Sequence, residues 1–161
     1  MPIDNWTARA RGGPAKREHA LEMGADVVLD HTDPGWTERI PEALGGDGLD
    51  VVFESIGGAS VGRLLDTMTP GTGRVLFYGV LDGEPAITPM DLLRRGLTLV
   101  GCGGMTDWAE RVRAARADAL AMAADGRVRP RIDSVLPLAD AAEAHRRIEN
   151  RAAVGKIILM P

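Results

Sequence analysis

A strand–helix–strand unit over residues 49–79 constrains the fold of this chain more than any other stretch. Residues 51–53 and 75–77 are short apolar runs without a polar break, which is typical of strands buried on both faces of a parallel sheet. Glycine follows each run, at Gly57 and at Gly79. In an open parallel sheet, ligands lie outside the carboxyl ends of the strands, where glycine lets them approach the backbone. The unit therefore predicts a cofactor-binding edge.

Predicted strands and helices alternate along the rest of the chain. Further strands are expected at residues 5–10, 25–30, 97–101, 132–138 and 154–160, and helices at residues 14–23, 33–44, 60–68, 90–95, 107–125 and 139–150. Ser60 can cap its helix, Asp107 and Glu110 suit a capping box, and Ala142 and Ile148 should face inward. Pro41 should kink or split its helix, because an interior proline costs about 3 kcal/mol. This alternation predicts an α/β fold with a parallel sheet.

Composition excludes several classes of function. The 161 residues carry a formal net charge of −4, which gives no reason to expect nucleic acid or an anionic membrane as a partner. No apolar stretch approaches the roughly 20 residues of a spanning helix, and residues 1–5 lack the pattern of a signal peptide. A single cysteine, Cys102, allows no internal disulfide and no cysteine-based zinc site. We expect a cytoplasmic protein without a metal site.

Five segments together carry a resemblance to a known family. They are GADVVLDH, GLDVVFESIGG, GRVLFYG, LTLVG and DGRVRPRIDSVLPLADAAEAHRRIENRAAVGKIIL. In their order and spacing they resemble the C-terminal half of the medium-chain dehydrogenase/reductase superfamily, and most of all its quinone oxidoreductase branch. The resemblance implies a Rossmann-like NAD(P)-binding domain over residues 1–130. It also implies that residues 131–161 return to a catalytic domain that this sequence lacks.

The chain departs from that family at its start. The family's first strand and its G-x-G-x-x-G turn, which holds the cofactor pyrophosphate on backbone N–H groups, have no counterpart in this sequence. We therefore expect a Rossmann-like sheet truncated at its N-terminus. Either residues 27–29 move beside residues 51–53, or another chain fills the gap, because buried backbone groups without partners cost about 1–3 kcal/mol each.

Three basic positions predict the choice of cofactor. By the resemblance, Lys16, His31 and Arg151 flank an adenosine 2′-phosphate, and Arg9 and Arg11 stand where NAD-dependent members carry an acidic residue. A phosphate carries about −2 charge and favours such a cluster, because charge-assisted hydrogen bonds are strong. NADP is thus favoured over NAD. The alternative is that these side chains are ordinary solvated surface charges.

The resemblance also places residues along the bound cofactor. Ser55 and Gly57, with Ile56 between them, should line the adenine side. Tyr78, Gly79 and Val80 should line the nicotinamide side, although a partly buried strand aromatic is an equal alternative for Tyr78.

No residue of the chain is assigned a catalytic role. Glu54 has no second acid or histidine placed beside it, and Cys102 has no partner base and is expected to be a small buried residue. His19 and His145 fall on charged helix faces and should be solvated.

Two functions from different classes remain open. The first is the cofactor-binding half of an NADPH-dependent oxidoreductase that transfers hydride to a quinone or an α,β-unsaturated carbonyl, with this chain alone expected to be inactive. The second is a non-catalytic fragment that acts only as a dimerisation or binding module. A methyltransferase-like domain gains nothing, because it too needs a glycine-rich first strand. Residues 97–105 should form the edge of a homodimer, unless residues 132–138 or 154–160 fold back and cover that edge.

Overall fold

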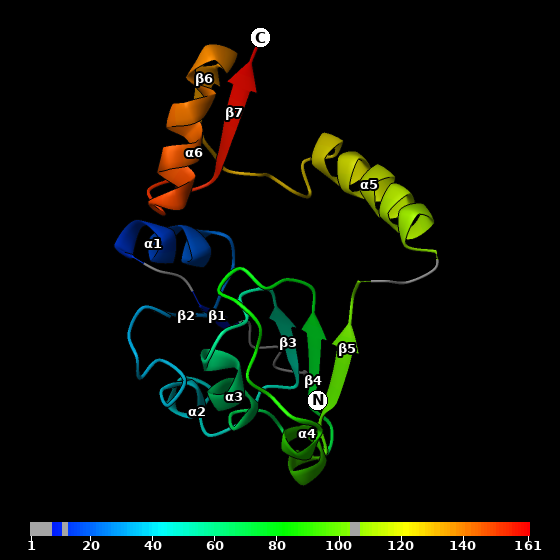
Figure 1. Cartoon of the computed structure of the whole chain (residues 1–161). Coiled ribbons are helices and arrows are strands. Elements are labelled where there is room, and N and C mark those ends of the chain that lie inside the picture. Colours follow the sequence, from blue (N-terminus) through cyan, green and yellow to red (C-terminus); the bar gives the residue numbers. More distant parts are fainter. Residues whose placement is uncertain (1–7, 11–12, 104–106) are drawn as a thin grey trace. The chain divides into compact units, whose positions relative to one another are not determined.

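The computed structural model describes residues 8–10, 13–103 and 107–161 (Figure 1). The chain divides into two compact units, Met1–Met105 (unit 1) and Thr106–Pro161 (unit 2), and each is described by itself. The domain boundary that we expected near residue 130 rests on the roles that these segments have in the resembled family, not on how this chain packs, and it stays a prediction.

Unit 1 is built from parallel strands and helices, as the alternation in the sequence predicted. In chain order it contains β1 (Ala8–Ala10), α1 (Pro14–Glu22), β2 (Val27–Leu29), α2 (Ile40–Ala43), β3 (Val51–Glu54), α3 (Ser60–Leu65), β4 (Arg74–Phe77), α4 (Pro89–Arg95) and β5 (Thr98–Gly101). Strands β1 and β2 form one parallel pair, and β3, β4 and β5 form a three-stranded parallel sheet in that order. The α/β class with a parallel sheet is thus confirmed.

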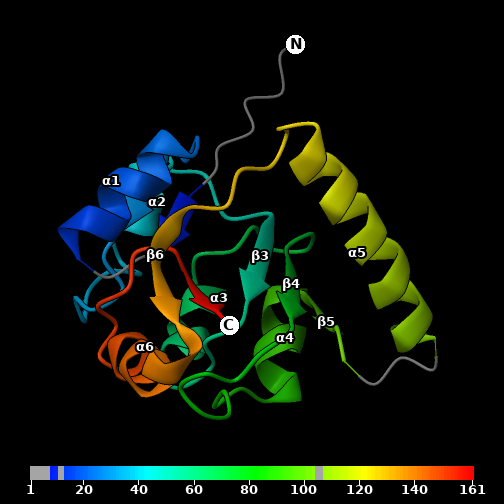
Figure 2. The same cartoon turned by 90° about the horizontal axis from the view of Figure 1, so that it is seen from above.

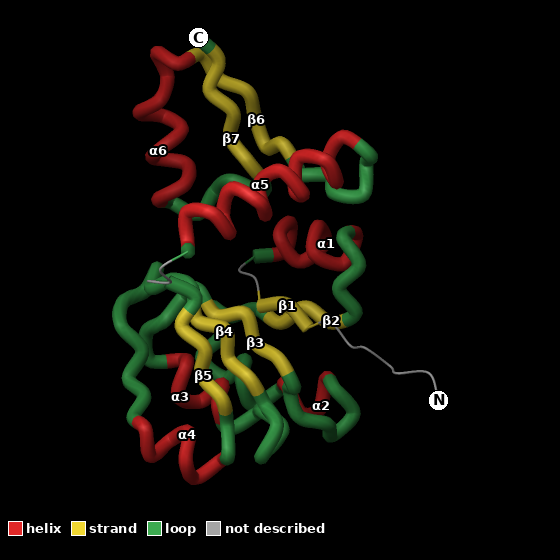
Figure 3. The backbone as a smooth tube through the Cα atoms, turned by 90° about the vertical axis from the view of Figure 1, so that its right-hand side faces the viewer, coloured by secondary structure: helices red, strands yellow, loops and turns green. Residues whose placement is uncertain are grey.

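The main core lies against one face of the three-stranded sheet. Val75 in the central strand is fully buried and packs with Leu65 of α3 and with Leu97. Helices α3 and α4 lie along this face (Figures 2 and 3). Side chains alternate between the faces of a strand, so Val51 and Phe53 point the other way, and Phe53 is 71% exposed. The prediction that this strand is buried on both faces is therefore wrong within the described residues.

The predicted helix over residues 33–44 forms only at its end. Residues 33–39 make turns, and α2 begins at Ile40. Pro41 then lies in the first turn of α2, where a missing N–H costs nothing. Buried Ile40 and Leu44 join Leu64 of α3 in a second apolar cluster. The proline thus decided where this helix starts.

Two predicted helix caps are absent. Ser60 is the first residue of α3 rather than its cap, and Ala59 takes the cap position without a side-chain bond. Asp107 precedes the long helix of unit 2, but its carboxylate pairs with Arg111 at 2.6 Å instead of capping the backbone.

The predicted rearrangement of β2 does not occur. Val27, Val28 and Leu29 pair in register with β1, whereas Val51 and its neighbours pair with β4 in a separate sheet. Strand β1 supplies backbone partners along one edge of β2. Whether another chain fills the gap stays a prediction.

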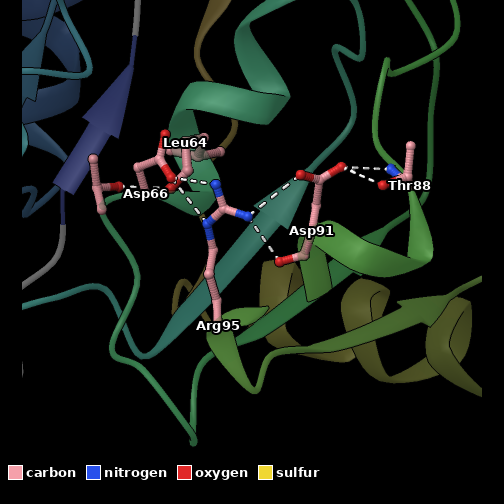
Figure 4. A network of polar contacts seen from close by, with 6 residues as sticks. Leu64, Asp66, Thr88, Asp91 and Arg95 are labelled. Carbon is pink, nitrogen blue, oxygen red and sulfur yellow. Dashed lines mark hydrogen bonds and ion pairs between the residues drawn. The ribbon is translucent and has the colours of Figure 1, made fainter. Parts of the chain in front are cut away.

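An arginine joins α4 to the end of α3 (Figure 4). Arg95 Nε donates to Asp66 Oδ1 at 2.9 Å, and Arg95 Nη1 donates to the Asp91 backbone oxygen at 2.8 Å. The Asp91 carboxylate also accepts the Thr88 N–H at 2.8 Å and the Thr88 hydroxyl at 2.7 Å. The Thr88 hydroxyl and N–H hold the pKa of Asp91 below its usual range, and Asp66 raises the pKa of Arg95. This network fixes the start of α4.

Unit 2 contains a long helix followed by a strand–helix–strand motif. Its elements are α5 (Trp108–Ala124), β6 (Ile132–Pro137), a 3-10 turn (Leu138–Asp140), α6 (Ala141–Glu149) and β7 (Lys156–Met160). Strands β6 and β7 pair in parallel, and Ala144 of α6 is buried. The prediction that Ala142 and Ile148 face inward is wrong, since both are exposed. The covered side of α6 carries Ala144 and the half-buried Arg147 instead.

An aspartate joins the two ends of this motif. Asp133 in β6 accepts the Val154 N–H at 2.8 Å on one oxygen and Arg147 Nη2 at 2.7 Å on the other. The Val154 N–H, helped by Ser134 and Arg147, holds the pKa of Asp133 below its usual range. The loop that leads into β7 is thereby fixed to β6.

Candidate functional site

The loops that follow β3 and β4 are hydrogen-bonded to each other, and we call residues 55–58 with residues 78–83 the double loop. Its bonds run from Tyr78 N–H to Glu54 O (2.9 Å), from Leu81 N–H to Ser55 O (3.2 Å), from Asp82 N–H to Ile56 O (2.7 Å) and from Gly58 N–H to Gly83 O (3.1 Å). These bonds continue the pairing of the two strands past their carboxyl ends. The edge at which a parallel sheet receives ligands is thus one connected piece of backbone.

Two glycines make this close pairing of the loops possible. A Cβ atom at Gly57 would lie 2.1 Å from the Gly83 oxygen, and Gly57 also has a φ of +79°. A Cβ atom at Gly79 would lie 2.8 Å from the Ser55 oxygen. We expected these glycines to admit a ligand, but contact between the loops is itself enough to require them.

The Glu54 side chain is hydrogen-bonded to the loop that follows β3. It is buried, with the residue 8% exposed, and Oε1 accepts the N–H groups of Ile56 and of Gly57, the latter at 2.9 Å. From the sequence we expected Glu54 to have no catalytic role, and we did not predict that its carboxylate bonds to the loop backbone. The available signal was a carboxylate that ends an apolar strand directly before a Gly-Gly turn.

The residues predicted to line the cofactor lie on the double loop and differ in exposure. Tyr78 is 58% exposed and Val80 is exposed as well, while Ser55 and Gly79 are half-buried. The alternative of a partly buried strand aromatic for Tyr78 is therefore wrong. The structure brings these four residues and Gly57 together along the double loop, and their contact with a cofactor stays a prediction.

Lys16 and His31 come from two segments that meet. Lys16 lies in the first turn of α1, and His31 lies two residues after the end of β2. The Gly13 N–H at the start of α1 donates to Asp30 Oδ2 at the end of β2, over 3.4 Å. Bonds from the Thr32 hydroxyl and N–H lower the pKa of Asp30, with smaller contributions from Gly13 and His31.

The other three basic residues lie in different parts of the chain. Arg151 lies in unit 2, two residues after the end of α6, with a φ of +55°. Arg9 lies in β1, and Arg11 lies outside the described residues. The predicted 2′-phosphate cluster therefore stays a prediction.

The described residues offer no obvious metal centre. Across residues 8–10, 13–103 and 107–161, no group of three or more His, Cys, Asp or Glu side chains could hold a metal ion. Cys102 is half-buried rather than buried, with Sγ 3.7 Å from the Val100 oxygen. His145 is exposed, and His19 is half-buried beside Glu22. In the same part of the chain, no helix is long and apolar enough to cross a membrane.

Comparison with known proteins places this geometry in a family. Residues 23–159 match the family described as zinc-binding dehydrogenase. Quinone oxidoreductase from Sus scrofa is 31% identical over 141 residues, which cover 87% of this chain and 42% of that protein. The synaptic vesicle membrane protein VAT-1 homolog of Homo sapiens is 24% identical in an alignment 178 residues long, and this alignment covers 99% of this chain and 45% of that protein.

Solved structures agree with this placement. An NAD-dependent alcohol dehydrogenase matches with a TM-score of 0.81 and 25% identity, over 97% of this chain and 44% of that one. A mycobacterial protein complexed with NADPH matches with a TM-score of 0.80 and 26% identity, over 97% of this chain and 49% of that one. The chain thus spans less than half the length of these relatives.

Proposed function

The chain belongs to the zinc-binding dehydrogenase family, and on that premise we propose that unit 1 binds NADPH as the cofactor-binding part of an oxidoreductase of the quinone oxidoreductase type. The observation that carries the proposal is the double loop at the carboxyl edge of a parallel sheet. When bound, the cofactor supplies the hydride, and a quinone or an α,β-unsaturated carbonyl receives it. The protein supplies position and electrostatics.

The chemistry of the double loop fits the uncharged parts of a dinucleotide. The N–H groups of Ile56, Gly57 and Gly58 already bond to Glu54 and Gly83, so they are not available to an anion. Exposed Tyr78 and Val80 present an aromatic and an apolar surface for adenine or nicotinamide. The pyrophosphate needs N–H donors from elsewhere, and no step is assigned to a metal ion.

Preference for NADPH over NADH is part of this proposal. Lys16 and His31 lie on segments that meet at the bond between Gly13 and Asp30, and these two residues of unit 1 carry the proposed preference. The predicted part of Arg151, which lies in unit 2, stays a prediction. A 2′-phosphate placed there would gain charge-assisted hydrogen bonds that a ribose hydroxyl cannot match.

Assembly through β5 is also part of the proposal. Strand β5 ends the three-stranded sheet, and Leu99 and Val100 are exposed on it. A second copy could pair with this strand and continue the sheet across two subunits. Leu97, which we expected in the interface, already belongs to the core of unit 1.

The occupied N–H groups also favour a second candidate, a module that binds no cofactor and serves only in dimerisation. Titration of the chain with NADPH, followed by cofactor fluorescence, separates the two. We expect saturable binding that is tighter for NADPH than for NADH and that weakens with salt. Absence of saturable binding at millimolar NADPH would leave only the dimerisation module.

A further inference from the structure

We propose that Glu54 is a positioning residue for cofactor binding, because its buried carboxylate fixes the double loop and decides which polar groups the sheet edge presents. This inference rests on the proposed function, and it concerns how the site is held rather than which residues touch the cofactor. Glu54 therefore acts through the loop backbone and has no part in proton transfer.

The geometry shows how one oxygen shapes the loop. Oε1 of Glu54 accepts N–H groups from Ile56 and Gly57, two and three residues further along the chain. Such bonds hold the chain in a tight turn directly after β3, with Gly57 at a positive φ. A carboxylate makes stronger hydrogen bonds to N–H groups than a neutral acceptor does. The turn is thereby fixed before any ligand arrives.

The turn fixed by Glu54 also sets the second loop. The Ile56 oxygen accepts the Asp82 N–H at 2.7 Å, and the Gly58 N–H donates to the Gly83 oxygen at 3.1 Å. Both bonds need residues 55–58 in their present shape. Loss of the Glu54 carboxylate should therefore loosen residues 78–83, including Tyr78 and Val80, although Glu54 lies on a different strand.

Glu54 further determines the polarity of the edge. With the N–H groups of Ile56 and Gly57 turned inward, the loop does not present them to solvent. A free pair of neighbouring N–H groups after a strand would attract anions. Glu54 thus selects for the uncharged parts of the dinucleotide at this edge, namely the adenine ring or the reduced nicotinamide ring.

Amide hydrogen exchange on the full chain tests the positioning directly. We expect Glu54→Ala to speed exchange at Ile56 and Gly57 by about tenfold or more, since two charge-assisted bonds are lost. Glu54→Gln keeps an acceptor oxygen and should restore most of the protection. If Glu54→Ala does not fold, Glu54→Asp replaces it, because its shorter side chain cannot reach both N–H groups.

Thr67→Val provides a matched control elsewhere in unit 1. Thr67 is also 8% exposed, and its hydroxyl donates to the Leu64 oxygen at 2.8 Å, away from the double loop. We expect it to lower stability while leaving the exchange rates at Ile56 and Gly57 and the NADPH affinity unchanged. If Glu54 only stabilised the fold, Glu54→Ala would likewise lower stability and leave these exchange rates and the NADPH affinity unchanged.

NADPH titration of the same variants completes the test. We expect Glu54→Ala to weaken NADPH binding by about tenfold and Glu54→Gln to stay within about threefold of the wild type. Unchanged exchange at Ile56 and Gly57 in Glu54→Ala would overturn the proposal. So would tighter NADPH binding by both variants, because Glu54 would then act only by charge repulsion. If the wild type binds no NADPH, the proposed function fails, and hydrogen exchange still decides whether Glu54 holds the loop.

Discussion

Replacement of Gly57 by alanine should damage the double loop far more than replacement of a glycine with the same backbone angle elsewhere. Gly57 has a φ of +79°, and Gly71, in the turn before β4, has a φ of +81°. A Cβ atom at Gly71 would have nothing within 4 Å, whereas one at Gly57 would lie 2.1 Å from the Gly83 oxygen. The two variants therefore share the backbone cost and differ only in the contact.

The structure gives the size of that difference. A left-handed conformation costs an alanine about 1–2 kcal/mol, and this applies equally to Gly71→Ala and Gly57→Ala. To reach ordinary contact at 3.4 Å, the loops of Gly57→Ala must open by about 1.3 Å. That opening breaks the bonds from Gly58 to Gly83 and from Asp82 to Ile56, each contributing about 1 kcal/mol. We expect Gly57→Ala to be about 2 kcal/mol less stable than Gly71→Ala.

Urea unfolding of the two variants and the wild type measures this difference, provided that the free energy of unfolding falls with urea concentration at the same slope in all three proteins. NADPH titration adds a functional measurement, because only Gly57→Ala should also weaken cofactor binding. Free energies of unfolding that agree within about 0.5 kcal/mol would refute the reasoning, since they would show that the loops part without cost.

Four further changes test other parts of the structure. Lys16→Gln should lower NADPH affinity more than NADH affinity at low salt, and equal losses measured by fluorescence titration would argue against a 2′-phosphate site. Leu99→Lys should give a soluble monomer, whereas a wild type already monomeric at high micromolar concentration by light scattering would remove the dimer. Thr88→Ala should cost about 1 kcal/mol in urea unfolding, because α4 loses the hydroxyl bond to Asp91. Asp133 has a lowered pKa, so its carboxylate stabilises the fold above about pH 4 and loses this effect as the pH falls through the lowered value. The stability advantage of the wild type over Asp133→Asn should therefore shrink on acidification, and an advantage that does not change with pH would contradict this.

Local patterns predicted the elements that local chemistry decides. The apolar runs at residues 75–77 and 97–101 became the strands β4 and β5, and Pro14 and Pro89 began helices as their fixed φ favours. These features depend on neighbours in the sequence, so they can be read without the fold.

Features that depend on distant partners could not be read in this way. Ala142 and Ile148 were expected to face inward, but α6 turns Ala144 and Arg147 toward the β6–β7 pair because Asp133 holds Arg147 there. Exposure of Phe53 likewise depends on which elements cover each face of the sheet. A pattern of apolar residues indicates that a helix or strand is partly buried, but it does not show which other element covers it.

The glycines after β3 and β4 show how a correct prediction can rest on an incomplete reason. Gly57 and Gly79 were read as openings for a ligand, yet each is already required by contact with the neighbouring loop. A glycine there is thus weak evidence for a cofactor. The hydrogen bonds add a second constraint, since Glu54 and Gly83 occupy the N–H groups of Ile56, Gly57 and Gly58 that an anion would need. If unit 1 binds a dinucleotide as proposed, this edge suits the uncharged parts of that ligand, and binding depends on the shape of the loops more than on open space beside a glycine.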